Sequence, residues 1–156
     1  MNFLSKRITL IFALCFAAAV VLVPPAMADM RAPKETEITV YKDPDCGCCK
    51  NWIEHLKKHG FHVTSHDTRD MASVKGNFGV KTDLQSCHTA IVNGYVIEGH
   101  VPAADIDRLL KERPKIAGLA VPGMPAGSPG MEGGSVEHYS VIAFDKTGTT
   151  KVYSRH

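Results

Sequence analysis

The sequence has almost no excess of charge of either sign. Its 156 residues contain 18 Lys and Arg against 16 Asp and Glu, which gives a formal net charge of +2 at pH 7. Lys6 and Arg7 account for this excess, so residues 29–156 carry 16 positive and 16 negative side chains. A chain without a basic surface has little means of neutralising phosphates, and we expect no nucleic-acid partner.

Long apolar runs are equally scarce, since the chain has one, at residues 8–23. Two basic residues precede this run, a Pro-Pro break follows it, and an A-x-A pattern ends at Ala28. This combination predicts a secretory signal peptide at residues 1–28, cleaved after Ala28, in place of a retained membrane anchor. We therefore expect residues 29–156 to form a single exported domain with no membrane segment.

Cysteine is rare but concentrated. Beyond Cys15 in the predicted signal peptide, the chain has Cys46, Cys48, Cys49 and Cys87. In an exported protein an even number of cysteines first suggests two structural disulfides. The spacing argues against that, because adjacent Cys48 and Cys49 cannot easily both find partners when only one distant cysteine exists. At most, the spacing supports a reversible Cys46–Cys49 bridge of the C-x-x-C type.

Three of these thiols lie between a predicted strand at residues 37–42 and a predicted helix at residues 48–59. At the start of a helix, the backbone N–H groups and the helix dipole favour the thiolate. The thiolate is the form that attacks disulfides and the form that binds soft metal ions. The segment therefore predicts a site of thiol chemistry.

Two kinds of thiol chemistry fit this spacing. A dithiol–disulfide exchanger needs Cys46 as nucleophile and Cys49 as resolving thiol, which leaves Cys48 and Cys87 surplus. A single zinc ion would need four converging ligands, yet Cys48 and Cys49 point about 100° apart if both are helical. A Cu(I) cluster, in which thiolates bridge several ions, does not meet that difficulty.

The expected elements alternate between strands and helices. Strands are expected at residues 37–42, 61–66, 89–92, 95–99, 139–144 and 149–153, helices at 48–59, 70–78 and 102–112, and loops at 80–87 and 115–135. The first two strands should form a parallel, right-handed βαβ unit, and Asn93-Gly94 predicts a type I′ hairpin. Residues 115–135 contain too much Gly and Pro to hold a regular element. The order resembles that of the thioredoxin fold, so we expect an α/β sandwich with an appended Gly/Pro/Met loop and a C-terminal β-hairpin.

A proline is missing where the thioredoxin resemblance would place one. In that fold the loop entering the third strand abuts the C-x-x-C segment and usually carries a cis-proline. Here the loop reads Ser86-Cys87-His88-Thr89. The resemblance implies that Cys87 lies beside the three-cysteine segment, and the absent proline weighs against a thiol–disulfide exchanger.

Methionine and histidine supply further candidate ligands. Met124 and Met131 lie on the Gly/Pro-rich loop, and a thioether is a soft ligand that selects Cu(I). The alternative is that both pack down as a lid, since methionine fills irregular gaps. We predict that one or both close over the cysteines. His88, next to Cys87, is the best-placed imidazole, and His100 is a weaker candidate.

The other histidines give no clear site. His55 and His59 share one helix face, which would allow a second His-based site, but a solvated face is the simpler interpretation. His62 and His66 share a strand face without an identifiable partner. The sequence assigns no role to any of the four.

Three segments together resemble the CopG-like family, a group described as a domain of unknown function. They are Tyr41-Lys42-Asp43-Pro44-Asp45-Cys46-Gly47-Cys48-Cys49, then Gly99-His100-Val101-Pro102, and Val121-Pro122-Gly123-Met124-Pro125 with Pro129-Gly130-Met131. The resemblance covers roughly residues 36–154.

This resemblance implies a bacterial periplasmic copper-binding protein of thioredoxin-like fold that takes part in copper resistance. It implies several Cu(I) ions held by Cys46, Cys48, Cys49 and Cys87, with Met124, Met131 and His88 as further ligands. Thiol redox could be coupled to the oxidation state of copper, and other periplasmic copper-handling proteins are candidate partners. The alternative is a thiol–disulfide oxidoreductase that uses Cys46 and Cys49, and the sequence does not choose between a binding protein and an enzyme.

Overall fold

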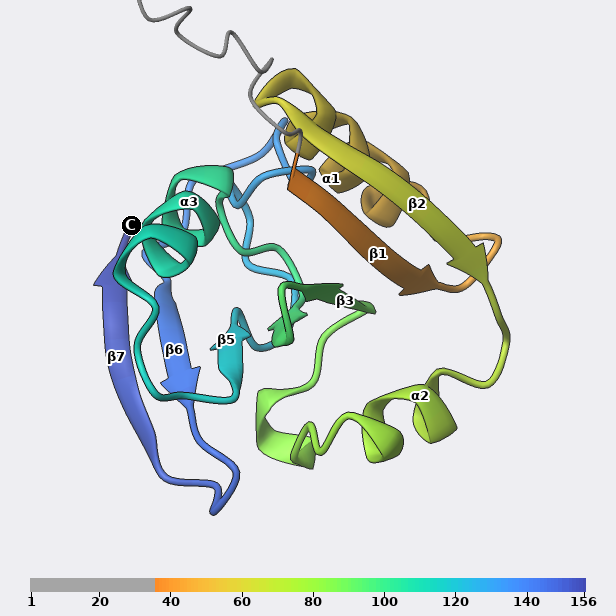
Figure 1. Ribbon diagram of the computed structural model, residues 1–156. Coiled ribbons are helices and arrows are strands. Elements are labelled where there is room, and N and C mark those ends of the chain that lie inside the picture. The colour runs from red at the N-terminus through yellow and green to blue at the C-terminus, as the bar shows by residue number, and fades with distance from the viewer. Residues whose placement is uncertain (1–35) are drawn as a thin grey trace, which may run out of the picture. The chain divides into compact units, whose positions relative to one another are not determined.

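Seven strands form one mixed sheet in the computed structural model, which describes residues 36–156. The strands are β1 (Thr36–Lys42), β2 (Phe61–Asp67), β3 (His88–Val92), β4 (Tyr95–Glu98), β5 (Gly118–Ala120), β6 (Ser140–Phe144) and β7 (Thr150–Arg155). The helices are α1 (Gly47–Lys58), α2 (Met71–Asn77) and α3 (Ala103–Glu112), with a short 3₁₀ helix at Thr82–Leu84. The sheet order is β2-β1-β3-β4-β5-β6-β7 (Figure 1). The predicted signal peptide lies outside the described residues.

The first part of the sheet follows the predicted element order, and the α/β class is confirmed. β1 and β2 run parallel and are joined by α1, as a βαβ unit requires. β3 then pairs antiparallel with β1, and β4 pairs antiparallel with β3. Asn93 and Gly94 have φ values of 45° and 84°, and a type I′ turn needs positive φ at both positions. This turn fixes the hairpin register, in which Val92 faces Tyr95.

One expectation about the chain after α3 is wrong. Residues 115–135 do hold a regular element, because β5 pairs parallel with β4 and antiparallel with β6. A Cβ on Gly118 would lie 2.0 Å from the carbonyl oxygen of Val96, so glycine is required where these strands approach each other. Through β5 the terminal hairpin of β6 and β7 continues the sheet.

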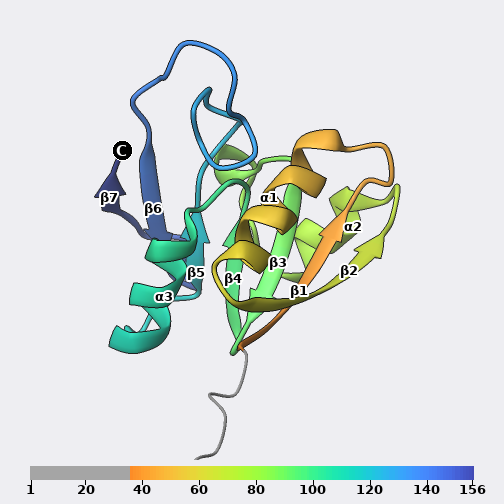
Figure 2. The same ribbon diagram turned by 90° about the horizontal axis from the view of Figure 1, so that it is seen from above.

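Each face of the sheet has its own apolar core. α1 and α3 cover one face and contribute Trp52 and Ile106 to its core, whereas α2 lies on the opposite face (Figure 2). The second core consists of Val80, Leu84, Val96, Ala120 and Phe144. Neighbouring strand residues such as Val96 and Ile97 belong to different cores, as the alternation of a pleated strand dictates. Within residues 36–156, none of the helices has the length and apolarity needed to span a bilayer.

A buried ion pair joins α2 to the sheet. The Glu98 side chain is fully buried and pairs with Lys75, whose side chain is 6% exposed. The same carboxylate accepts hydrogen bonds from the backbone N–H of Ser86 at 2.7 Å and from the Thr89 hydroxyl at 2.6 Å. A buried charge is tolerated when it is paired and its hydrogen-bonding capacity is filled. Glu98 therefore ties α2 to the segment that leads into β3.

Replacing Glu98 with Gln should strongly destabilise the fold, because the Lys75 ammonium is then buried without a counter-charge. We expect the free energy of unfolding to fall by about 3–5 kcal/mol, measured by urea denaturation with Trp52 fluorescence. The matched control is Glu54→Gln, which breaks an ion pair with Lys57 whose side chains are 59% and 49% exposed. That change should alter the free energy of unfolding by less than about 1 kcal/mol, and equal effects of the two substitutions would contradict this account.

Candidate metal-binding site

The N-terminus of α1 carries three cysteines in distinct positions. Cys46 is the N-cap, and its sulfur accepts a hydrogen bond from the N–H of Cys49 at 3.3 Å. A disulfide joins Cys46 to Cys49, as the C-x-x-C spacing predicted. Cys49 is fully buried, Cys46 is partly exposed, and Cys48 is a free thiol. The helix end thus presents one dithiol pair and one further thiol.

Cys87 lies next to these cysteines, which confirms the expectation drawn from the thioredoxin resemblance. Its sulfur is 3.8 Å from the Cys48 sulfur, which is 3.5 Å from the Cys46 sulfur. All four cysteine sulfurs lie within 4.8 Å of one another. The register of β1 and β3 explains this, because Lys42 at the end of β1 faces His88 at the start of β3. Residues just after β1 therefore meet residues just before β3.

The Gly/Pro-rich loop brings one thioether to the cluster. The Met124 sulfur lies 3.9 Å from the Cys48 sulfur, and the Met124 side chain is 52% exposed. The adjacent Gly123 fixes its position, since the Gly123 N–H donates to the carbonyl oxygen of Gln85 at 3.2 Å. The Gly123 carbonyl in turn accepts a hydrogen bond from the Ser86 hydroxyl. Met124 is thereby tied to the segment that carries Cys87.

Packing against α1 holds the rest of this loop. Gly130 has a φ of +87°, and a Cβ there would lie 2.8 Å from the backbone nitrogen of Trp52. Ser128 is fully buried, and its carbonyl oxygen accepts a hydrogen bond from the Met131 N–H at 2.8 Å. In residues 36–156 the thioether in contact with a cluster thiol is that of Met124. Ligation by Met131 stays a prediction.

His100 belongs to the cluster, although sequence reasoning ranked it below His88. Its Nε2 lies 3.0 Å from the Cys87 sulfur, and its Nδ1 lies 2.8 Å from the carbonyl oxygen of Pro129. A carbonyl can only accept, so Nδ1 carries the proton and Nε2 presents a lone pair to the thiol. The sequence contains a signal for the proximity of His100 to Cys87. The Asn-Gly turn fixes a register in which Thr89 faces Glu98, and continuing that count places Cys87 opposite His100.

His88 is the second imidazole at Cys87, as predicted. Its Nδ1 is 3.2 Å from the Cys87 sulfur, and its Nε2 is buried without a hydrogen-bond partner in residues 36–156. Burial above all holds the pKa of His88 well below its usual value, with the nearby His100 and Lys75 acting in the same direction. The ring is therefore neutral, which is the form that binds metal ions. It packs against Trp52, with ring centroids 4.3 Å apart.

The Cys87 thiol is held in its protonated form. Burial raises the pKa of Cys87 to about 12, and the neighbouring Cys48 thiol adds to the shift. A metal ion that binds this sulfur must displace the proton. Without a metal ion, Cys87 is a poor nucleophile, because the thiolate is the attacking species. The Cys87 thiol is therefore expected to react once a metal ion has displaced its proton.

The donor atoms form two overlapping groups. One group is the four cysteine sulfurs, and the other is Cys87 with His88 and His100. Neither group contains a carboxylate from residues 36–156. Thiolate, thioether and imidazole ligands suit Cu(I) and other soft ions, whereas calcium and magnesium need oxygen ligands. The donor set therefore fits copper.

The remaining histidines of α1 and β2 have other contacts. His55 Nε2 accepts a hydrogen bond from the Ala103 N–H at 3.1 Å, so it caps the start of α3, and the expectation of a solvated face is wrong for this residue. His59 is exposed, with its Nδ1 2.8 Å from the carbonyl oxygen of His55. His66 stacks on a tyrosine of β1 at 5.4 Å between ring centroids, and His62 is exposed.

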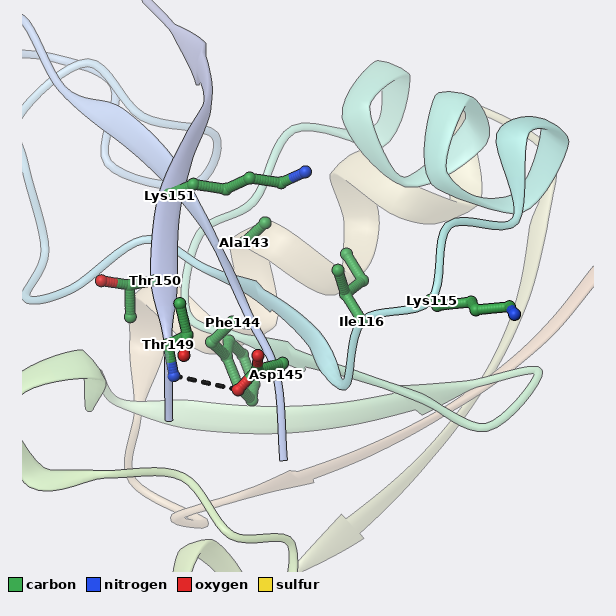
Figure 3. A pocket seen from close by; sticks show the side chains of 8 residues that line it. All are labelled: Lys115, Ile116, Ala143, Phe144, Asp145, Thr149, Thr150 and Lys151. Atoms are coloured by element: carbon green, nitrogen blue, oxygen red, sulfur yellow. Dashed lines mark hydrogen bonds between the residues drawn. The ribbon is translucent and has the colours of Figure 1, made fainter. Parts of the chain in front are cut away.

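A pocket beside the β6–β7 turn has none of these donors (Figure 3). Its volume is about 210 Å³, and it is lined by Lys115, Ile116, Ala143, Phe144, Asp145, Thr149, Thr150 and Lys151. The Asp145 carboxylate accepts a hydrogen bond from the Thr149 N–H at 2.9 Å and so belongs to the turn. No Cys, His or Met lines the pocket, and we assign it no chemistry.

Comparisons with known proteins identify a family model of unknown function and two solved structures described as copper resistance proteins. Residues 84–131 match a family model described as "Protein of unknown function, DUF411". Two solved structures described as copper resistance protein CopG, Form 1 and Form 2, each share 47% sequence identity with this chain, with TM-scores of 0.75 and 0.76. The similarity covers 79% of this chain and 98% and 99% of those chains. The chain belongs to the CopG family. A comparison with curated proteins gives no match.

In this CopG-family protein, Cys87 should react slowly with iodoacetamide while the Cys46–Cys49 disulfide is closed. Alkylation needs the thiolate, and burial raises the pKa of Cys87 to about 12. The rate constant should therefore rise about tenfold per pH unit between about pH 7 and pH 10. Mass spectrometry of tryptic peptide 82–108 would follow the reaction. In urea the rate should level off near the ordinary thiol pKa, and the same levelling in the folded protein would contradict the prediction.

Substituting Gly130 with Ala should displace the Gly/Pro-rich loop from α1. The new Cβ would lie 2.8 Å from the nitrogen of Trp52 and 2.9 Å from the carbonyl oxygen of Cys48, and backbone atoms cannot move aside cheaply. We expect the free energy of unfolding to fall by about 1–3 kcal/mol, measured by urea denaturation. The control is Gly133→Ala, where φ is +110° but no atom lies within 4 Å of the new Cβ. A loss at Gly130 no larger than at Gly133 would contradict the packing argument.

Proposed function

We propose that the protein holds more than one Cu(I) ion in the cluster formed by Cys46, Cys48, Cys49 and Cys87. The observation that carries this proposal is the convergence of four cysteine sulfurs within 4.8 Å of one another. Cys48 and Cys49 are adjacent on a helix and cannot readily serve as terminal ligands of one ion. Sulfurs this close can instead bridge neighbouring ions, and soft thiolates select Cu(I).

Imidazole and thioether groups would complete the coordination. His100 directs the Nε2 lone pair at the cluster while its Nδ1–H donates to a backbone carbonyl. That second hydrogen bond is the usual way in which proteins orient a metal-binding histidine. Met124 has its sulfur beside Cys48, and the Nδ1 of His88 lies 3.2 Å from the Cys87 sulfur. Met131 is a further candidate ligand.

Full loading requires the Cys46–Cys49 disulfide to open. Reduction adds two electrons and two protons and yields two thiols, each of which loses its proton when it binds a metal ion. With the disulfide closed, copper meets only the sulfurs of Cys48 and Cys87 as thiols. The state of this disulfide therefore sets how many thiolates are available.

The proposed setting is copper resistance in the periplasm, with residues 29–156 as the mature domain. The description of the similar solved structures as copper resistance proteins supports the first part. The signal-peptide pattern of residues 1–28 supports export. Other periplasmic copper-handling proteins are the expected partners. Met124, 52% exposed and in contact with Cys48, offers them a soft ligand at the surface of the site.

A thiol–disulfide oxidoreductase is the second candidate function. It is favoured by the Cys46–Cys49 disulfide at a helix N-terminus, in which the first cysteine is partly exposed and the second is buried. A nucleophile that a substrate can reach and a protected resolving thiol are what disulfide exchange needs. That reading leaves the proximity of Cys87, His100 and Met124 without a role.

Anaerobic titration of the fully reduced protein with Cu(I), against a competing chelator, tests the proposed function. We expect more than one Cu(I) per chain, retained more tightly than zinc. Replacing Met124 with Leu keeps the size of the side chain and removes the sulfur, so it should weaken the affinity for Cu(I) by roughly tenfold. The same substitution at Met131 is the matched comparison, and we expect a smaller effect there.

Weak Cu(I) binding, or preferential zinc binding, would overturn the copper proposal. Reductase activity towards insulin disulfides that is indifferent to Met124→Leu and lost in Cys46→Ser would support the oxidoreductase instead. Wild-type Cu(I) retention in Met124→Leu would leave this methionine as packing over the cluster.

A further inference from the structure

The two thiols outside the disulfide lie in contact with each other. The sulfurs of Cys48 and Cys87 are 3.8 Å apart, although the two residues are separated by 39 positions in the sequence. Both thiols are free and both side chains are half-buried. Sulfur atoms at this distance are close to van der Waals contact, so a small rotation of either side chain would bring them within reach of a bond.

The fold itself maintains this contact. Cys48 is fixed in the first turn of α1, and Cys87 directly precedes β3. α1 and β3 are packed together through Trp52 and His88, whose ring centroids are 4.3 Å apart. α1 holds Cys48, and the hydrogen bonds from Ser86 and Thr89 to Glu98, on either side of Cys87, hold the segment that carries the second sulfur.

This arrangement resolves an objection raised by the sequence. From the spacing alone, adjacent Cys48 and Cys49 cannot easily both find partners. In the structure, Cys49 reaches back to Cys46 while Cys48 faces Cys87. The Cys48 sulfur lies 3.5 Å from that of Cys46 and 3.8 Å from that of Cys87. Because Cys46 is bonded to Cys49, Cys87 is the free thiol that Cys48 contacts within residues 36–156.

We propose that Cys48 and Cys87 are a second redox pair, so that the reduced chain delivers four electrons to Cu(II), two from each pair of thiols. The inference deepens the proposed function, because it takes copper as the oxidant. The new step is balanced as follows. The two S–H bonds are lost, one S–S bond forms between Cys48 and Cys87, two Cu²⁺ are reduced to two Cu⁺, and two protons pass to the buffer.

Oxidation of the second pair would have a consequence that oxidation of the first would not. The Cys46–Cys49 disulfide is local to the start of α1. A Cys48–Cys87 disulfide would join α1 to the segment before β3 and close a loop of about forty residues. It would also remove the last two thiolates from the cluster, so the fully oxidised chain would release the Cu(I) that it had made.

The decisive experiment uses a chain that has only the second pair. The variant Cys15→Ser, Cys46→Ser, Cys49→Ser is reduced, freed of reductant under anaerobic conditions and treated with Cu(II) in excess chromophoric Cu(I) chelator. We expect two Cu(I) per chain and complete loss of free thiol. Trypsin should yield peptides 43–50 and 82–108 joined by a disulfide, with the protein still monomeric. Circular dichroism and Trp52 fluorescence establish that the variant is folded.

The same measurement on the four-thiol chain gives the matched comparison. With Cys15→Ser alone we expect four Cu(I) per chain, and with a further Cys48→Ser or Cys87→Ser we expect two. Two Cu(I) from the four-thiol chain, free thiols left in the two-thiol chain, or disulfide-linked dimers in place of the internal bridge would overturn the second pair.

This result is independent of the test of the proposed function. Tight Cu(I) binding by the reduced protein combined with a yield of two electrons would overturn the inference alone. A yield of four electrons combined with weak Cu(I) binding would support the second pair and overturn the proposed Cu(I) cluster. If the two-thiol variant fails to fold, peptide mapping of the oxidised four-thiol chain decides. Peptide 43–50 also contains Cys46 and Cys49, so fragmentation of the linked peptides must assign the bond to Cys48 and Cys87, and a bond from Cys46 or Cys49 to Cys87 would overturn the second pair.

Discussion

The antiparallel pairing of β3 with both β1 and β4 is the constraint on which the site depends. It sets Lys42 opposite His88 and Thr89 opposite Glu98, so the chain leaving β1, the chain entering β3 and the chain leaving β4 meet at one edge of the sheet. A slip of one residue would turn every side chain to the other face. The two apolar cores prevent such a slip, because each holds alternate residues of the same strands.

Burial of polar groups around this edge is made possible by the Glu98 carboxylate. It accepts hydrogen bonds from Ser86 and Thr89, the residues on either side of the Cys87-His88 dipeptide, and it pairs with Lys75. The dipeptide is therefore held at both ends, while Cys87 and His88 themselves stay available to a metal ion. The low polarity that keeps the Cys87 thiol protonated also keeps His88 neutral. Cys87 therefore becomes a thiolate when a metal ion displaces its proton, whereas His88 is already in the neutral form that binds metal ions.

The sequence was sufficient for six of the seven strands, the three α-helices and the C-x-x-C disulfide, because each has a local signature such as alternation, a cap or a fixed spacing. It was also sufficient to place Cys87, once the element order was matched to a known fold. It failed at β5, where Gly118 is required by close approach to Val96 and is indistinguishable in sequence from a turn glycine. His100 was undervalued for a different reason. Its proximity to Cys87 follows from counting along the hairpin, whereas its tautomer depends on a contact with Pro129 from a loop whose path no local rule predicts.

The four cysteine sulfurs lie close together, but different parts of the structure hold them in place. Cys46 and Cys49 both lie at the N-terminal end of α1, so their bond is local to that helix end. Cys48 lies on α1 and Cys87 directly precedes β3, and the packing of Trp52 on His88 holds these two parts of the chain together. Under the proposed function, Cys46 and Cys49 would supply sulfur ligands from the end of α1, and Cys48 and Cys87 would supply ligands from both sides of the α1–β3 contact. The proposed copper binding and the proposed oxidation of the second pair would therefore both depend on the α1–β3 contact.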